Sequence, residues 1–139
     1  MSIAALDLGR RRIGLAIADD DGLAAHPVGA IERRSIRRDI EQLIVRMAGY
    51  EVTRVVVGLP LNMDGSAGPG ARMAAAFAEH LRQTTGLIVD LFDERLTSFE
   101  AEERLKEIGG RGLRNKAAID AVAACVILEG WIEQRRRAR

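Results

Sequence analysis

The sequence predicts an α/β domain with a mixed five-stranded sheet and helices on both of its faces. Two observations predict it. The first three apolar segments are joined by connections too short for a helix, which favours an antiparallel meander. The next two apolar segments alternate with segments of helical periodicity, which calls for parallel pairing and right-handed crossovers. At 139 residues and 47% hydrophobic content, the chain is long enough to bury the core of one domain.

Five strands follow from apolar runs that end at turn residues. A glycine and three arginines separate the first two strands, and an Asp-Asp-Asp-Gly cluster separates the second from the third. The fourth segment is rich in valine and ends in Gly-Leu-Pro, which is typical of a buried strand. The expected strands are residues 3–8, 13–18, 27–32, 52–59 and 87–92.

Four helices follow from helical spacing and from capping residues. Ser35 can cap the first helix, Pro69 can begin the second, and Gly86 can end it. A Thr-Ser-Phe-Glu capping box opens the third helix, which ends at a Gly-Gly pair. The expected helices are residues 36–47, 69–85, 97–110 and 116–133. This order of strands and helices is the layout of the ribonuclease H-like fold.

Acidic residues stand at three widely separated points in otherwise apolar stretches. Asp7 lies in the first strand, Asp93 and Glu94 close the fifth, and Asp120 lies inside the last helix. A carboxylate in apolar surroundings is costly unless it is paired, hydrogen-bonded or bound to a metal. Convergence of such oxygen ligands, without a Cys or His cluster, points to Mg²⁺ or Mn²⁺ and to phosphoryl chemistry.

Each acidic residue also has a structural interpretation when it is taken alone. Asp7 can be a hydrogen-bonding strand residue, and the Asp-Glu-Arg run can be a salt-bridged strand end. Asp120 and Lys116 are four positions apart on one helix, and most such pairs are surface ion pairs. The occurrence of all the acids in one short domain favours the catalytic interpretation.

Four motifs in a fixed order resemble the YqgF/RuvX family of the ribonuclease H-like superfamily. Members of this family have been described as pre-16S ribosomal RNA nucleases and, earlier, as Holliday junction resolvases. The resemblance extends over residues 3–131, with a serine at position 98 where many members have threonine. The motifs are ALDLGRRRIG at 5–14, VVGLPLNMDGS at 56–66, DERLTS at 93–98 and IDAVAA at 119–124.

The resemblance implies a nuclease in which carboxylates hold two metal ions about 4 Å apart. Asp7 would be the ligand that bridges the ions at the centre of the sheet. Glu94 would be the second ligand, with Asp93 as its close competitor, and Asp120 would complete the set from the last helix. Lys116 is a further candidate for contact with the scissile phosphate.

Basic residues supply candidate contacts to nucleic acid. The chain has 19 arginines and 2 lysines, and arginine binds phosphate bidentately, although codon bias in a GC-rich genome explains the same excess. Residues 62–68 form a glycine-containing loop before a helix, which suits a contact with a substrate backbone. A further group, Arg33, Arg34, Arg37 and Arg38, is either a second basic patch or a solvated face. The candidate contacts are Arg10, Arg11, Arg12, Asn62, Arg95, Arg111 and Arg114.

The sequence therefore predicts a Mg²⁺- or Mn²⁺-dependent nuclease that processes the end of pre-16S ribosomal RNA. One alternative is a Holliday junction resolvase, which should be a symmetric dimer. Another is a non-catalytic nucleic-acid-binding protein, which would be expected to have lost the acids. Nucleotide-binding enzymes of the same fold need two such domains, and 139 residues hold one. The expected partner is structured RNA or branched DNA, and the chain is a monomer or a homodimer.

Composition sets further expectations about organisation and location. Aromatic residues make up only 4% of the chain, which disfavours modules that stack RNA bases on a sheet. Cys125 is the single cysteine, so neither an internal disulfide nor a cysteine zinc site can form. No apolar run approaches the ~20 residues of a membrane span, and no signal peptide precedes the first strand. We expect a cytoplasmic nuclease domain at residues 1–134, followed by a basic tail at 135–139.

Overall fold

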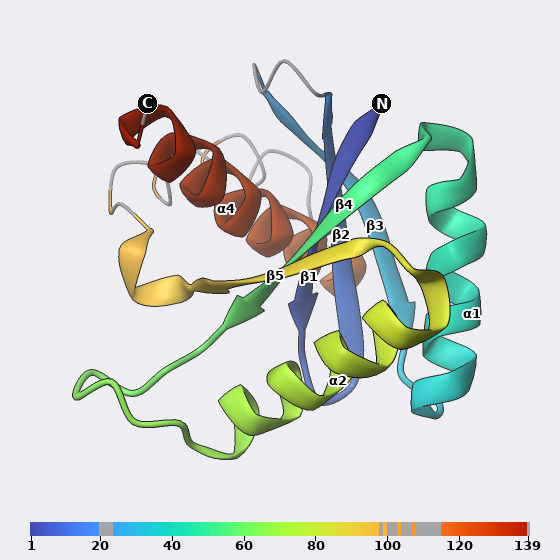
Figure 1. The fold of residues 1–139 in the computed structure, drawn as a ribbon, viewed down its shortest axis with the longest axis horizontal. Helices are drawn as coiled ribbons and strands as arrows, with labels where there is room; N and C mark the ends of the chain where they lie inside the picture. The colour runs from blue at the N-terminus through green and yellow to red at the C-terminus, as the bar shows by residue number, and fades with distance from the viewer. Residues whose placement is uncertain (20–23, 98, 100–102, 104–106, 108–114, 139) are drawn as a thin grey trace.

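A computed structural model describes residues 1–19, 24–97, 99, 103, 107 and 115–138 (Figure 1). The expected turn at 19–22 and the expected helix at 97–110, with Ser98, therefore lie largely outside the described residues. The elements in chain order are β1 (Ser2–Leu8), β2 (Arg12–Asp19), β3 (Ala25–Glu32), α1 (Ile36–Met47), η1 (Ala48–Tyr50), β4 (Val52–Leu59), α2 (Pro69–Thr85), β5 (Ile88–Asp93), η2 (Glu94–Leu96) and α4 (Lys116–Arg137).

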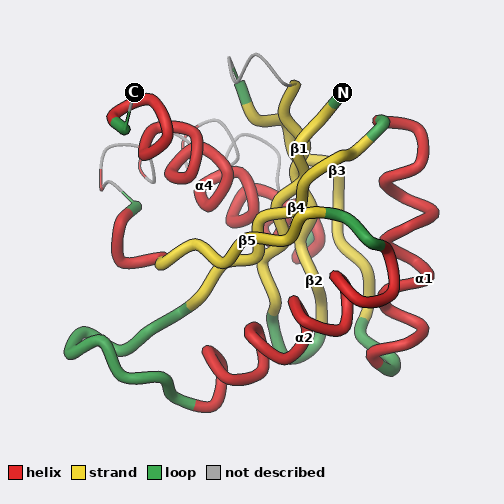
Figure 2. Tube along the Cα trace, viewed as in Figure 1, coloured by secondary structure: helices red, strands yellow, loops and turns green. Residues whose placement is uncertain are grey.

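The sheet has the mixed topology that the sequence predicts. Its five strands lie in the order β3-β2-β1-β4-β5 (Figure 2). β1 pairs antiparallel with β2, and β2 pairs antiparallel with β3. β1 pairs parallel with β4, and β4 pairs parallel with β5. β1 is therefore the central strand, and both of its edges are occupied.

Helices cover both faces of the sheet and divide the core into two clusters. One cluster packs α1 and α2 against the sheet and includes Ala4 and Leu6 of β1. The other packs α4 against the opposite face and includes Ile3 and Ala5 of the same strand. Because side chains alternate along a strand, Asp7 continues the row of Ile3 and Ala5 onto the face that α4 covers.

Local capping signals account for the helix boundaries. The Ser35 hydroxyl accepts a hydrogen bond from the Arg38 backbone N–H at 3.2 Å, which begins α1. α2 starts at Pro69 and ends at Gly86, whose φ of 71° is left-handed. The last helix runs beyond the expected end at residue 133, through Arg137. The Arg135 guanidinium lies 4.6 Å from the centre of the Trp131 ring, which helps to hold this extension in place.

Within the described part of the chain, none of the helices combines the length and the apolar character that crossing a membrane requires.

Candidate active site

Asp7 occupies the carboxyl end of the central strand. It pairs with Gly14 of β2, and it follows the Leu6–Val57 pair that joins β1 to β4. Burial, together with the smaller effect of the negative charge of Asp120, raises the pKa of Asp7 to about 6. Asp7 and Asp120 therefore share one electrostatic environment despite their separation in the sequence.

Two glycines on the same face of the sheet make room for the other acidic groups. A Cβ atom at Gly14 would lie 2.0 Å from the backbone oxygen of Asp120, so only glycine lets α4 approach β2 here. A Cβ atom at Gly58 would lie 3.1 Å from Oε2 of Glu94. Asp120 thus lies over the strand on one side of Asp7, and the Glu94 carboxylate lies over the strand on the other.

Arg12 is bound to one of the predicted metal ligands. Its Nε donates a hydrogen bond to Oδ2 of Asp120 at 2.5 Å, and the two side chains are 28% and 23% exposed. From the sequence, Arg12 is a candidate contact to nucleic acid, and in the structure its guanidinium is paired with Asp120. Lys116, by contrast, lies exposed at the first position of α4.

The structure distinguishes the two acids at the end of β5. The Asp93 carboxylate accepts hydrogen bonds from Nε of Arg95 at 3.0 Å and from NH2 of Arg95 at 2.7 Å. These bonds lower the pKa of Asp93 from its usual value. Asp93 is thus committed to Arg95, while Glu94 is directed toward Gly58 and the neighbourhood of Asp7.

The loop after β4 lies at the same edge of the sheet as η2 (Figure 1). Arg95 joins the two segments, because its NH1 donates to the Met63 carbonyl at 3.3 Å. The loop is also held by its own bonds: the Asn62 side-chain amide donates to the Ser66 hydroxyl at 2.9 Å, and the Ser66 backbone N–H donates to Oδ1 of Asp64 at 2.9 Å. Asn62 and Arg95 therefore shape the rim of the site, and Asp64 acts as a turn residue.

Exposed arginines border the site at the turn between β1 and β2. Arg10 and Arg11 are both exposed there. Two hydrogen bonds from Arg33 hold this turn in place. Its backbone N–H donates to the Arg11 carbonyl at 2.8 Å, and its NH1 donates to the Gly9 carbonyl at 3.3 Å. Arg111 and Arg114 lie outside the described residues.

The carboxylates fit a hard divalent cation by their chemistry. Asp7, Glu94 and Asp120 offer only oxygen donors, which Mg²⁺ and Mn²⁺ prefer. The buried charge of Asp7 is unfavourable in the protein alone, and a cation would offset it. Among residues 1–19, 24–97 and 115–138, however, no three His, Cys, Asp or Glu side chains already stand in an arrangement that encloses an ion.

Solved structures share this fold across nearly their whole length. One is RuvC of T. thermophilus in complex with a Holliday junction substrate, with a TM-score of 0.61, 14% identity, and coverage of 98% of this chain and 96% of that chain. Another is the Holliday junction resolvase of fowlpox virus, with a TM-score of 0.61, 12% identity, and coverage of 96% and 99%. The fold is thus that of the ribonuclease H-like α/β proteins, in the arrangement found in RuvC-type resolvases.

Sequence comparison defines the family within this class. A family model described as "RuvX: Holliday junction resolvase" matches residues 1–134. A protein of Anaeromyxobacter sp. strain Fw109-5 named "Putative pre-16S rRNA nuclease" is 50% identical over 135 residues, which cover 97% of this chain and 98% of that protein. A protein of the same name from Myxococcus xanthus is 43% identical, with coverage of 98% and 90%. The chain belongs to the RuvX family.

Proposed function

We propose that this protein is a metal-dependent nuclease that hydrolyses phosphodiester bonds in structured RNA, with the end of pre-16S ribosomal RNA as its natural substrate. The main observation behind the proposal is the position of Asp7 between two glycines, which admit Asp120 on one side and Glu94 on the other. The name shared by the Anaeromyxobacter and Myxococcus relatives supports the choice of substrate.

Asp7, Glu94 and Asp120 are the proposed ligands of two Mg²⁺ or Mn²⁺ ions. When bound, such ions neutralise charge on the phosphodiester and make water a stronger nucleophile near neutral pH. Asp7 comes from the rigid centre of the sheet, which fixes the position of the site. Arg12 balances the charge of Asp120 when no ion is bound, since it is paired with that carboxylate.

Exposed basic groups around the carboxylates are proposed to position the substrate. Arg10 and Arg11 lie one turn beyond the strand that carries Asp7, and Lys116 lies one helical turn before Asp120. Contacts of this kind to phosphates give affinity and register without reading the base sequence. From the sequence alone, Arg111 and Arg114 remain candidates for the same role.

Resolution of Holliday junctions is the second candidate function. The description of the family model and the shared fold of RuvC-type resolvases favour it. Two symmetric cuts in a junction require two sites, and therefore a homodimer, whereas trimming one RNA end requires only one site. Light scattering of the purified protein, with and without a four-way junction, distinguishes these two states.

The experiment that tests the proposal compares two substrates under the same conditions. An end-labelled pre-16S RNA fragment and a synthetic four-way DNA junction are each incubated with the protein in Mg²⁺, Mn²⁺ or EDTA. We expect metal-dependent cleavage of the RNA, none in EDTA, and weaker cleavage of the junction. Stronger cleavage of the junction than of the RNA would instead support Holliday junction resolution as the function. Failure to cut either substrate in any metal would favour a binding protein without catalysis.

A further inference from the structure

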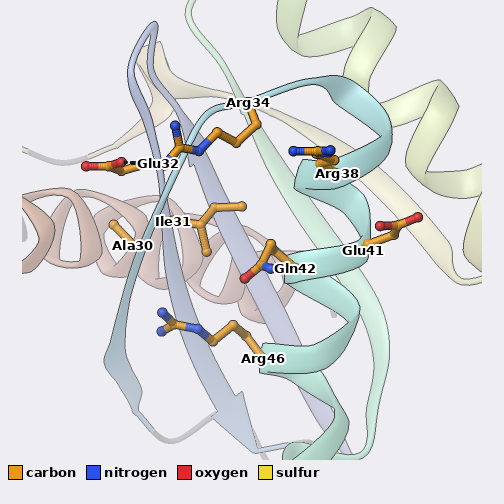
Figure 3. A pocket seen from close by; sticks show the side chains of 8 residues that line it. All are labelled: Ala30, Ile31, Glu32, Arg34, Arg38, Glu41, Gln42 and Arg46. Carbon is orange, nitrogen blue, oxygen red and sulfur yellow. Dashed lines mark hydrogen bonds and ion pairs between the residues drawn. The ribbon is translucent and has the colours of Figure 1, made fainter.

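A groove runs between the edge strand β3 and helix α1, and it takes no part in the proposed catalytic site (Figure 3). Its volume is about 600 Å³. β3 is the outermost strand on this side of the sheet, so the groove is open to solvent along one side. Its lining residues are Ala30, Ile31, Glu32, Arg34, Arg38, Glu41, Gln42 and Arg46.

Hydrogen-bond donors recur every four residues along one wall of the groove. Arg38, Gln42 and Arg46 lie in one row of α1, and Arg34, which precedes the helix, is four residues before Arg38. Four residues advance a helix by about 6 Å, a step on the scale of one nucleotide in an extended strand. Figure 3 shows Arg34, Gln42 and Arg46 extending from this wall toward β3.

Among the residues that the structure describes, the carboxylates of the groove pair with neither Arg38 nor Arg46. Glu32 pairs with Arg34 at 3.3 Å in a highly exposed contact, and Glu41 pairs with Arg37 at 3.4 Å. Both carboxylates that line the groove are thus engaged by arginines other than Arg38 and Arg46. Arg38 and Arg46 form no ion pair with another residue in the described part of the chain.

The Arg46 side chain reaches from α1 to the neighbourhood of β3. A Cβ atom at Gly29 of β3 would lie 3.4 Å from NH1 of Arg46. Gly29 has a φ of 151°. An arginine held this way presents its donors to a ligand in the groove and has no carboxylate to compete for them.

The groove begins at the end of the sheet where the catalytic carboxylates lie. Glu32, at its upper end, pairs in register with Arg12, and the backbone N–H of Arg33 donates to the Arg11 carbonyl at 2.8 Å. Because Asp7 faces α4 and the groove lies on the α1 side of the sheet, a strand bound at Asp7 would reach Arg34 by passing around the Arg10–Arg11 turn. No aromatic side chain lines the groove, which suits contacts to a backbone better than stacking of bases.

We propose that the β3–α1 groove is a second nucleic-acid contact, which binds the phosphodiester backbone of the strand that extends away from the catalytic site. Arg34, Arg38 and Arg46 contact phosphates along one strand, and Gln42 donates to the same backbone between Arg38 and Arg46. This inference rests on the proposed nuclease function and adds to it a binding path outside the carboxylate site.

The test measures how binding depends on salt and on strand length. Fluorescence anisotropy follows single-stranded RNAs of increasing length, in EDTA so that metal-dependent cleavage does not occur. The variant is R38Q/R46Q. The matched control is R82Q/R137Q, which removes the same charge from exposed ion pairs on α2 and α4. Thermal melting confirms that each variant is folded.

For long strands, we expect R38Q/R46Q to reduce the slope of log K against log salt by about 1.4, at about 0.7 for each lost phosphate contact. For strands that end within the catalytic site, wild type and variant should bind alike. The control variant should keep the wild-type slope at every length. The inference would be overturned if R38Q/R46Q had the same salt slope as wild type on long strands. It would also be overturned if R38Q/R46Q and R82Q/R137Q lost the same amount of slope.

Cleavage of the shortest substrate separates this inference from the proposed function. If wild type cuts it in Mg²⁺ or Mn²⁺ and R38Q/R46Q binds long strands like wild type, only the groove proposal fails. If wild type neither cuts nor binds strands of any length, both proposals fail.

Discussion

Arg12 and Asp120 are 108 positions apart in the sequence, yet they form an ion pair of 2.5 Å between Nε and Oδ2. The pair joins the start of β2 to the first turns of α4, beside the buried carboxyl group of Asp7. In the protein without metal, Arg12 thus supplies the positive charge nearest to Asp120. A metal ion held by Asp120, as we propose, would compete with Arg12 for that carboxylate.

Replacing Arg12 with glutamine should change stability and metal affinity in opposite directions. Loss of the charged hydrogen bond should lower the free energy of unfolding in EDTA by about 1–3 kcal/mol. Removal of the competing cation should tighten binding of Mn²⁺, measured by titration calorimetry. Arg11→Gln, an exposed neighbour, is the control and should alter neither quantity. Unchanged Mn²⁺ affinity in Arg12→Gln would contradict the competition.

Replacing Asp7 with asparagine should stabilise the metal-free protein at high pH. Because the pKa of Asp7 is raised in the folded state, its charged form opposes folding above pH 6 and its protonated form does not oppose it below about pH 4. The shift from 3.8 to about 6 corresponds to at most about 3 kcal/mol. In urea unfolding with EDTA, Asp7→Asn should therefore have a higher free energy of unfolding than the wild type at pH 8. At pH 4 the two proteins should have nearly equal free energies of unfolding. A less stable variant at pH 8 would contradict this account.

The parts of the fold with local signals could be predicted from the sequence. The valine-rich segment 52–59 and the helix 69–85 have the predicted bounds, because a Gly-Leu-Pro end, Pro69 and Gly86 mark them locally. β3 begins two residues earlier than expected, since pairing of Ala25 with Ala18 of β2 extends it. α4 continues past residue 133, where Arg135 packs on Trp131. Both differences depend on partners elsewhere in the chain.

The candidate site residues also differ in how strong a signal each has in the sequence. A carboxylate in an apolar segment is conspicuous in the sequence, so Asp7 and Asp120 could be singled out. The partner of Arg12 could not be, because the ion pair depends on where α4 crosses β2. The importance of Gly14 and Gly58 likewise depends on the groups packed above them. Their only signal in the sequence is the presence of glycine in otherwise apolar strands.

Replacing Gly14 with alanine should disturb the site and the fold together. The added methyl group would lie 2.0 Å from the Asp120 backbone oxygen, so α4 must move away from β2. We expect a loss of at least about 1–3 kcal/mol in the free energy of unfolding, together with reduced cleavage. Gly49→Ala is the matched control, because a Cβ atom there meets nothing within 4 Å. Equal stability of the two variants would show that α4 does not pack closely on Gly14.

Removing the Asp39 carboxylate should loosen the turn that carries Arg10 and Arg11. Asp39 is 1% exposed and accepts a hydrogen bond from Nε of Arg33 at 3.2 Å, while Arg33 binds the Gly9 carbonyl. Breaking a buried pair typically costs about 3–5 kcal/mol, so Asp39→Asn should unfold at lower urea concentration. Glu41→Gln, from an exposed pair on the same helix, should have little effect. A loss in Glu41→Gln as large as that in Asp39→Asn would contradict a special role for the buried pair.

The central claim is that Asp7, Glu94 and Asp120 form one catalytic site, and single-turnover cleavage of the preferred substrate in Mg²⁺ or Mn²⁺ tests it most directly. The informative comparison is Glu94→Gln with Asp93→Asn. The Asp93 carboxylate binds Arg95, whereas the Glu94 carboxylate lies near Gly58. We predict that Glu94→Gln loses cleavage as completely as Asp7→Asn and Asp120→Asn, while Asp93→Asn retains most of it. Full activity in Glu94→Gln, or in Asp7→Asn, would contradict the claim.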